Sequence, residues 1–144
     1  MKKFIRTTCV IVALVILLTV PVSAAGTTIR SNPYIAIYSS YFARTSSMYQ
    51  FQVWFEVTGT NTMDKIGVSE IIIQRRDSEE DDWSTLKTFL PEDYPNMIIT
   101  NALGHDSYVT YTAPPGYYYR AIVTFYAKKG NGTTEIFDYP EFYF

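Results

Sequence analysis

Two segments of the chain alternate strictly between inward and outward positions. In residues 50–57 every second side chain is apolar, whereas the other face is polar apart from Trp54. In residues 117–128 the same period of two recurs, but both faces are partly apolar. This period is typical of a half-buried β-strand. The side chains predicted to point inward are Phe51, Val53, Phe55, Val57, Tyr117, Tyr119, Ala121, Val123 and Phe125.

Five shorter runs complete the predicted strands. The run 69–76 forms a hairpin with 83–89, and 117–128 forms one with 133–137 across a Gly-Asn-Gly turn. No stretch of ten or more residues holds a helical apolar period. The pattern therefore predicts an all-β domain, a single antiparallel seven-stranded sandwich. The remaining predicted strands are Ile35–Tyr41, Ser69–Arg76, Trp83–Phe89, Tyr108–Thr112 and Thr133–Phe137.

The N-terminus has the layout of a secretory signal peptide. Lys2, Lys3 and Arg6 precede an apolar run of 12 residues that begins at Cys9. This run is shorter than the roughly 20 residues of a membrane-spanning helix, so no permanent membrane anchor is expected. Small residues predict cleavage after Ala24, or after Ala25 as the alternative. The predicted organisation is a signal peptide, 1–24, and one secreted β-sandwich domain, 25–144.

Removal of this segment changes the charge and the redox chemistry of the chain. Three of the 12 basic residues leave and all 14 acidic residues stay, so the net charge becomes 9 − 14 = −5. Nucleic acid and anionic membranes, which require clustered Lys and Arg, are therefore not expected partners. The only cysteine, Cys9, also leaves, unless it is a lipidation site. Export without disulfides favours a Gram-positive bacterial source.

Two resemblances follow from particular residues. The segment Pro115–Val123 resembles the loop and sixth strand of fibronectin type III and immunoglobulin-like domains, which implies that Tyr119 is the corner tyrosine. Met63–Gly67, Trp83, His105 and Val123–Lys128 resemble small secreted Firmicutes proteins of a family of unknown function. These resemblances imply an immunoglobulin-like sandwich and an extracellular location. They imply no catalytic role.

Catalytic and cofactor chemistry finds little support among the side chains. His105 is the single histidine, in a loop-like stretch, and without thiolates it cannot complete a zinc site or a hydrolytic triad. Glycine loops that bind phosphate or dinucleotides are absent, so no cofactor is expected. A carboxylate-based hydrolase remains an alternative, because glycoside hydrolysis requires only two carboxyl groups. The candidate carboxylates are Glu56, Glu70, Asp106 and Glu135.

The run Asp77–Asp82 carries five carboxylates in six residues. Such a run could offer oxygen ligands to Ca²⁺, but it lacks the alternating Asp pattern of a calcium loop. A hairpin tip is also an ordinary place for solvated charge. We interpret this run as a solvated turn and retain calcium binding as the alternative.

The outward face of residues 117–128 is unusually apolar. Tyr118, Ile122 and Tyr126 point outward there, and Ile72 is expected beside them. Such a patch is typical of an interface with protein or sugar, unless the N-terminal segment or residues 139–144 cover it. The leading hypothesis is a non-catalytic secreted module that binds a protein or a wall polymer. A small hydrolase and a secreted toxin or antagonist are the alternatives.

Overall fold

The computed structural model describes residues 32–144, whose regular elements are seven strands and one short 3-10 helix. The predicted signal peptide and its cleavage sites at Ala24 and Ala25 lie outside these residues. Every strand pairing is antiparallel, and the described part of the chain is all-β, as predicted. The elements are β1 (Ile35–Arg44), β2 (Gln50–Arg76), β3 (Ser84–Phe89), η1 (Pro95–Met97), β4 (Ile98–Thr112), β5 (Tyr118–Lys129), β6 (Gly132–Asp138) and β7 (Glu141–Tyr143).

Within residues 32–144, the structure contains no helix with the length and apolar character that crossing a membrane requires.

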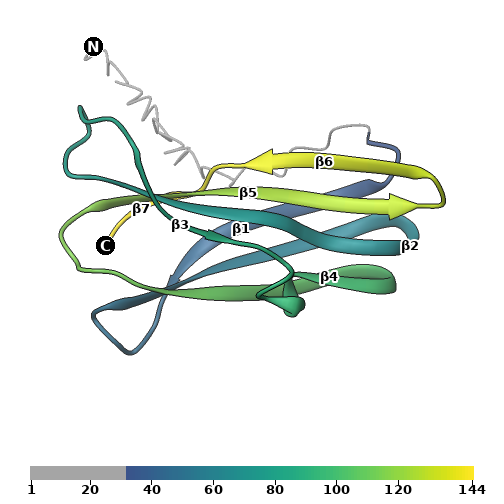
Figure 1. The fold of residues 1–144 in the computed structure, drawn as a ribbon, viewed down its shortest axis with the longest axis horizontal. Helices are drawn as coiled ribbons and strands as arrows, with labels where there is room; N and C mark the ends of the chain where they lie inside the picture. The colour runs from purple at the N-terminus through teal and green to yellow at the C-terminus, as the bar shows by residue number, and fades with distance from the viewer. Residues whose placement is uncertain (1–31) are drawn as a thin grey trace, which may run out of the picture.

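The long strand β2 organises the sheet. Its first part pairs with β1 on one side and with β4 on the other, whereas its last part pairs with β3 and β5. On the far edge of β5, β6 and β7 follow one another along the strand. The strands thus form one curled antiparallel sheet, with β5 and β6 on one side of the core and β4 on the other (Figure 1).

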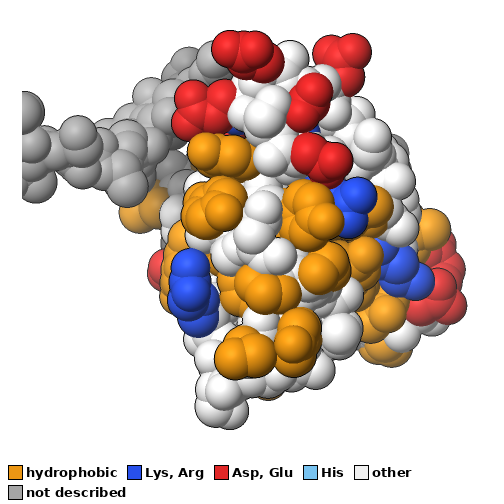
Figure 2. All heavy atoms as spheres, turned by 90° about the vertical axis from the view of Figure 1, so that its left-hand side faces the viewer, with side chains coloured by type: hydrophobic (Ala, Val, Ile, Leu, Met, Phe, Trp, Pro, Cys, Tyr) orange, Lys and Arg blue, Asp and Glu red, His pale blue; other side chains and the backbone are white. Residues whose placement is uncertain are grey.

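One end of the curled sheet gathers three turns and the C-terminus (Figure 1). Hydrophobic side chains cluster on this end, with acidic groups along one border (Figure 2). Met48 and Tyr49, in the turn between β1 and β2, are 67% and 54% exposed. A hollow of about 290 Å³ lies here, lined by Arg44, Thr45, Ser46, Ser47, Met48, Pro115 and Phe144.

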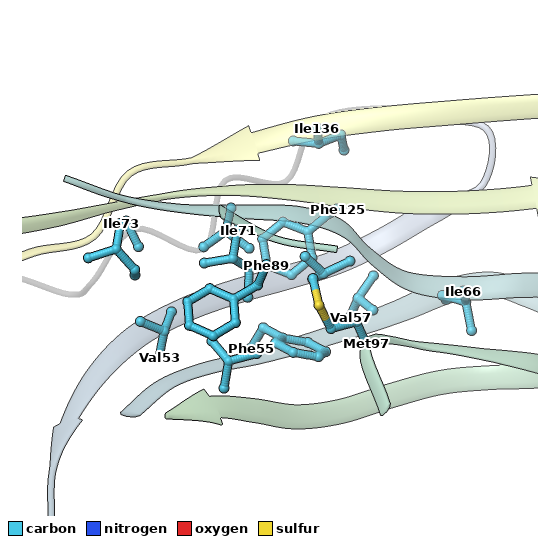
Figure 3. Close-up of a cluster of buried hydrophobic side chains, with 14 of the residues drawn as sticks. Val53, Phe55, Val57, Ile66, Ile71, Ile73, Phe89, Met97, Phe125 and Ile136 are labelled. Carbon is cyan, nitrogen blue, oxygen red and sulfur yellow. The ribbon is translucent and has the colours of Figure 1, made fainter. Parts of the chain in front are cut away.

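The core lies between the two parts of the curled sheet. The side chains predicted to point inward from the period of two are fully buried, except Tyr117, which precedes β5 and is half-buried. Ile71 and Ile73 meet the buried set from the last part of β2 (Figure 3). Aromatic rings from the two parts contact each other. The ring centroids of Phe51 and Tyr119 lie 5.1 Å apart, and those of Phe42 and Phe142 lie 4.2 Å apart. Burial of this apolar surface is the main stabilising contribution to the fold.

Two predicted strands, Gln50–Val57 and Ser69–Arg76, prove to be parts of the single strand β2. The residues between them pair as well, with shifts of register after Thr58 and after Val68. Gly67 has a φ of +153°, and a Cβ there would collide with the carbonyl oxygen of Met97. Glycine therefore lets β2 pass close to the start of β4 without breaking its pairing. Met63 and Ile66 are fully buried in this segment.

Strand β4 is three times as long as the predicted strand Tyr108–Thr112, with 15 residues. It includes the stretch around His105, which was expected to be loop-like. This part of β4 pairs with the middle of β2, for example Ala102 with Met63. Asn101, at a φ of 52°, introduces an irregularity that hides the strand period. Strand β7 was not predicted at all.

Tyr119 occupies the corner that precedes most of β5. Its hydroxyl group donates a hydrogen bond of 2.7 Å to the backbone oxygen of Pro114, five residues upstream. The side chain is fully buried, and this burial raises the pKa of the Tyr119 hydroxyl above its usual value. The hydrogen bond expected of a corner tyrosine is therefore present.

Tyr119→Phe is expected to lower the free energy of unfolding by about 1 kcal/mol, the net value of one hydrogen bond. The cost stays modest because Pro114 is exposed and its oxygen can bind water instead. The raised pKa adds a pH dependence: above about pH 10 an unfolded tyrosine ionises while folded Tyr119 stays protonated, so stability falls as pH rises. The variant should lose less stability over that range.

Urea unfolding at neutral and alkaline pH measures both effects. Tyr49→Phe is the matched control, because Tyr49 is 54% exposed in a turn. An identical alkaline loss of stability in the wild type and in Tyr119→Phe would contradict the pH prediction.

Candidate binding surface

Three aromatic side chains form a row across the outer face of β1, β2 and β4. Tyr41 is paired with Trp54, which is paired in turn with Tyr108. Their positions alternate with core residues such as Val53 and Phe55, so the pleat directs all three rings outward. Tyr41 is 53% exposed and Tyr108 is 41% exposed. We call Tyr41, Trp54 and Tyr108 the aromatic row.

The rings of the aromatic row are ordered by their contacts. The centroids of Tyr41 and Trp54 lie 6.4 Å apart with ring planes at 5°, and those of Trp54 and Tyr108 lie 4.6 Å apart at 34°. The indole Nε1 of Trp54 donates a hydrogen bond of 2.9 Å to Oε1 of Gln52, two residues earlier on the same face. Trp54 is therefore held in one orientation, which reduces the entropy that a ligand loses on binding.

Two carboxylates flank the aromatic row. Glu56 of β2 lies directly opposite Asp106 of β4, one outward position beyond Trp54 and Tyr108. Together with Tyr41, Trp54 and Phe55 they line a hollow of about 210 Å³. Hydroxyl and amine groups of a ligand in this hollow could donate hydrogen bonds to the two carboxylates.

The four residues of the face predicted from the sequence lie on β5 and the last part of β2. Ile72 lies directly opposite Ile122, Tyr126 lies opposite Gly67, and Tyr118 lies opposite Arg76. The four side chains of the predicted face, Ile72, Tyr118, Ile122 and Tyr126, are half-buried.

The C-terminal segment lies beside this predicted face rather than across it. Strand β7 pairs edge to edge with the start of β5, and the Tyr143 ring lies 4.9 Å from that of Tyr118. Phe142 and Phe144 turn inward and contact Phe51. Residues 141–143 thus extend the sheet and shield one side of Tyr118 only.

At one end of the predicted face, charged and polar side chains contact one another and the Trp83 ring. The guanidinium groups of Arg76 and Arg120 both lie 4.5 Å from the Trp83 ring. Arg120 also donates two hydrogen bonds to Gln74, of 3.0 and 2.6 Å, and both arginines approach Glu141. Partial burial, with Glu79 nearby, raises the pKa of Tyr118. Arg120 and Gln74 are thus paired with each other, whereas the Nε of Arg76 is buried without a hydrogen-bond partner among residues 32–144.

His105 lies in strand β4 and not in a loop. Its Nε2 lies 2.6 Å from the backbone oxygen of Asn96, and its ring packs edge-on against Phe55 at 5.7 Å. The side chain of Asn96 donates to Ser107 and to the Tyr108 oxygen. The contact between His105 and Asn96 therefore connects β4 with η1, in agreement with a structural role.

The four candidate carboxylates separate into two groups. Glu56 and Asp106 meet beside the aromatic row, whereas Glu70 and Glu135 belong to the outer face of β2, β5 and β6. Glu135 accepts a hydrogen bond of 3.3 Å from Ser69. Only Glu56 and Asp106 lie directly opposite one another in the pairing.

The acidic turn 77–82 is exposed throughout, as predicted. Asp81 accepts hydrogen bonds from both the backbone and the side chain of Ser78, and Asp77 lies 3.7 Å from Arg75. Over residues 32–144, no three acidic, histidine or cysteine side chains are grouped so that they could hold a metal ion.

Comparison with known proteins identifies no family. No protein-family model matches the chain, and no curated protein matches it. Sporulation control protein Spo0M from Bacillus subtilis is similar in structure at a TM-score of 0.40 and 12% identity, over 69% of this chain and 47% of that one. A family 76 glycoside hydrolase from a bovine Bacteroides thetaiotaomicron strain has a TM-score of 0.35 and 15% identity, over 78% and 21%. The chain spans less than half the length of either protein.

Proposed function

We propose that this chain is a secreted, non-catalytic carbohydrate-binding domain that contacts a polysaccharide through the aromatic row. The observation that carries the proposal is the alignment of Tyr41, Trp54 and Tyr108 in register on an outer sheet face. The proposed domain comprises residues 25–144, and the signal peptide 1–24 exports it from a Gram-positive bacterium. The proposal includes kinship to the small secreted Firmicutes proteins.

The proposed fold is an immunoglobulin-like sandwich of the fibronectin type III kind. Its support is the order of pairing: β1, the first part of β2 and β4 form one group, and β3, the last part of β2, β5 and β6 form the other. This order matches the division of strands between the two sheets of such domains. The hydrogen bond from Tyr119 to Pro114 supports the same assignment.

A sugar polymer suits the chemistry of this face. Tyrosine and tryptophan combine a large apolar surface with a polar group, so they can cover the C–H face of a sugar ring while hydroxyl groups stay hydrated. Gln52, Glu56 and Asp106 lie on the same face and can accept hydrogen bonds from sugar hydroxyls. A row of rings across three strands offers contacts to successive sugar units of an extended chain.

Retention of the purified mature protein on polysaccharides tests the proposal. Affinity electrophoresis through gels that contain wall polysaccharides, chitin derivatives or plant glucans should show retardation by at least one of them. The same samples should release no new reducing ends. Failure of the folded protein to bind any polysaccharide would refute the proposal.

A carboxylate-based hydrolase is the second candidate function, favoured by the pairing of Glu56 with Asp106. Release of reducing ends that Glu56→Gln and Asp106→Asn each abolish would support the hydrolase over the binding domain. A folded protein that binds without product release supports the binding domain.

The face of Ile72, Tyr118, Ile122 and Tyr126 is the second candidate surface, because Ile72 and Ile122 meet there with Phe137, 52% exposed, on β6. We expect the double variant Tyr118→Ser with Tyr126→Ser to keep wild-type retention on the polysaccharide, since neither side chain lies on the aromatic row. Affinity electrophoresis beside the wild type measures this. Lost retention at an unchanged melting temperature would instead assign the binding to the predicted face.

A further inference from the structure

We propose that the aromatic row prefers sugars that carry a protonated amine, such as glucosamine units, over the same sugars in neutral, N-acetylated form. This inference rests on the carbohydrate-binding function proposed above and names the ligand class of the same surface. Three features of the face carry it: the two opposed carboxylates, the charge of their surroundings and their position beside the rings.

The first feature is the direct opposition of two like charges. Glu56 and Asp106 are cross-strand partners on an exposed face. Like charges directly opposite in a sheet destabilise the folded state. Residues that lower the stability of the folded state are often found at binding sites, because function there can require them.

The second feature is the absence of positive charge around this pair. The outward positions of β1, β2 and β4 beside Glu56 and Asp106 are occupied by Ser39, Trp54, Tyr108 and other uncharged residues. Among residues 32–144, the ion pairs join Arg75, Arg76, Arg120 and Lys129 to other carboxylates. Within these described residues, no ion pair involves Glu56 or Asp106, so a cationic ligand could neutralise their charge.

The third feature is the position of the carboxylates relative to the rings. Glu56 and Asp106 line the same hollow of about 210 Å³ as Tyr41 and Trp54. A sugar stacked on the rings would present its ring substituents to the carboxylates. A protonated amine at that position gains a charged hydrogen bond, and the electron-rich faces of Trp54 and Tyr41 attract the same cation. An anionic sugar is repelled by the same charges.

Glucosamine and N-acetylglucosamine hexamers are suitable probes, because they share a backbone and differ only in the acetyl group on each nitrogen. In mildly acidic buffer at low salt, the wild type should bind the amine form about threefold to tenfold more tightly, as expected for exposed ion pairs. In about 1 M NaCl, where the Debye length is about 3 Å, the difference should largely vanish.

The double variant Glu56→Gln with Asp106→Asn should bind the amine and the N-acetylated hexamers with about equal affinity, because it lacks the negative charge that favours the amine. Its melting temperature should equal or exceed that of the wild type, because the repulsion is removed. Glu135→Gln, on the outer face of β6, is the matched control and should keep the preference. Isothermal titration calorimetry gives the affinities.

Equal wild-type affinity for the two hexamers, or a preference that survives the double variant, would overturn this inference and leave carbohydrate binding in place. Loss of binding to every polysaccharide in the wild type would overturn the proposed function and this inference together. A preference that disappears with salt and with the two carboxylates supports the inference.

Discussion

Replacement of Phe51 by alanine is expected to lower the free energy of unfolding by about 3–5 kcal/mol, the range for large aromatic residues in a core. The ring is fully buried where β1, β2, β5 and β7 meet. Its neighbours come from distant parts of the chain, so they cannot close the resulting cavity without moving whole strands. Its aromatic contacts, at 5.1 to 5.6 Å, are Phe42, Tyr111, Tyr119, Phe142 and Phe144.

Urea denaturation followed by circular dichroism measures this loss. Phe137→Ala is the matched control, because Phe137 is 52% exposed on the outer face of β6, and its cost should stay within about 0.5 kcal/mol. If Phe51→Ala does not fold, Phe51→Leu keeps most of the apolar volume and should still be clearly destabilised. Equal effects at Phe51 and Phe137 would contradict the position of Phe51 at the centre of the core.

The inward faces of the strands could be predicted from the sequence because a period of two is a local property. Phe51, Phe55 and Val123 are buried as the alternation indicated. The hairpins β2 with β3 and β5 with β6 were also predicted, since each joins neighbouring strands through a short turn. Local pattern and turn chemistry are sufficient for such features.

The bend of β2 and the start of β4 could not be predicted because both depend on distant pairing. Ala102 lies in a strand because it meets Met63, 39 residues earlier in the sequence. Strand β7 has three residues, which is too short for a periodic signal. Phe142 stands between Glu141 and Tyr143 on β7, and its packing against Phe42 and Phe51 shows that it points inward.

The candidate binding surface was missed for a related reason. Trp54 was recognised as the exception on a polar strand face, but one residue does not define a surface. Tyr41 ends one predicted strand and Tyr108 begins another, so their alignment with Trp54 depends on the registers of two pairings. The face with Tyr118, Ile122 and Tyr126 was easier to recognise, because all three lie on one strand.

Trp54→Ala is expected to weaken polysaccharide binding by about 30-fold or more, because a central aromatic anchor contributes about 2 kcal/mol or more to an interface. Trp54 is the middle ring of the aromatic row, in contact with both Tyr41 and Tyr108. Its removal interrupts the row and leaves Gln52 without its indole partner. Tyr41→Ala and Tyr108→Ala should each have a smaller effect, since each removes one end of the row.

The two tryptophans of the chain allow this prediction to be tested on one residue at a time. In the variant Trp83→Phe, Trp54 is the only source of indole fluorescence, and a saturating change on addition of polysaccharide would place the ligand at Trp54. The converse variant, Trp54→Phe, reports on Trp83, which lies against Arg76 and Arg120 at the other face and should not respond. A fluorescence change confined to Trp83, or full binding by Trp54→Ala, would contradict the role of the aromatic row. Because the two indoles belong to opposite outer faces of the curled sheet, this pair of variants distinguishes the two candidate surfaces directly.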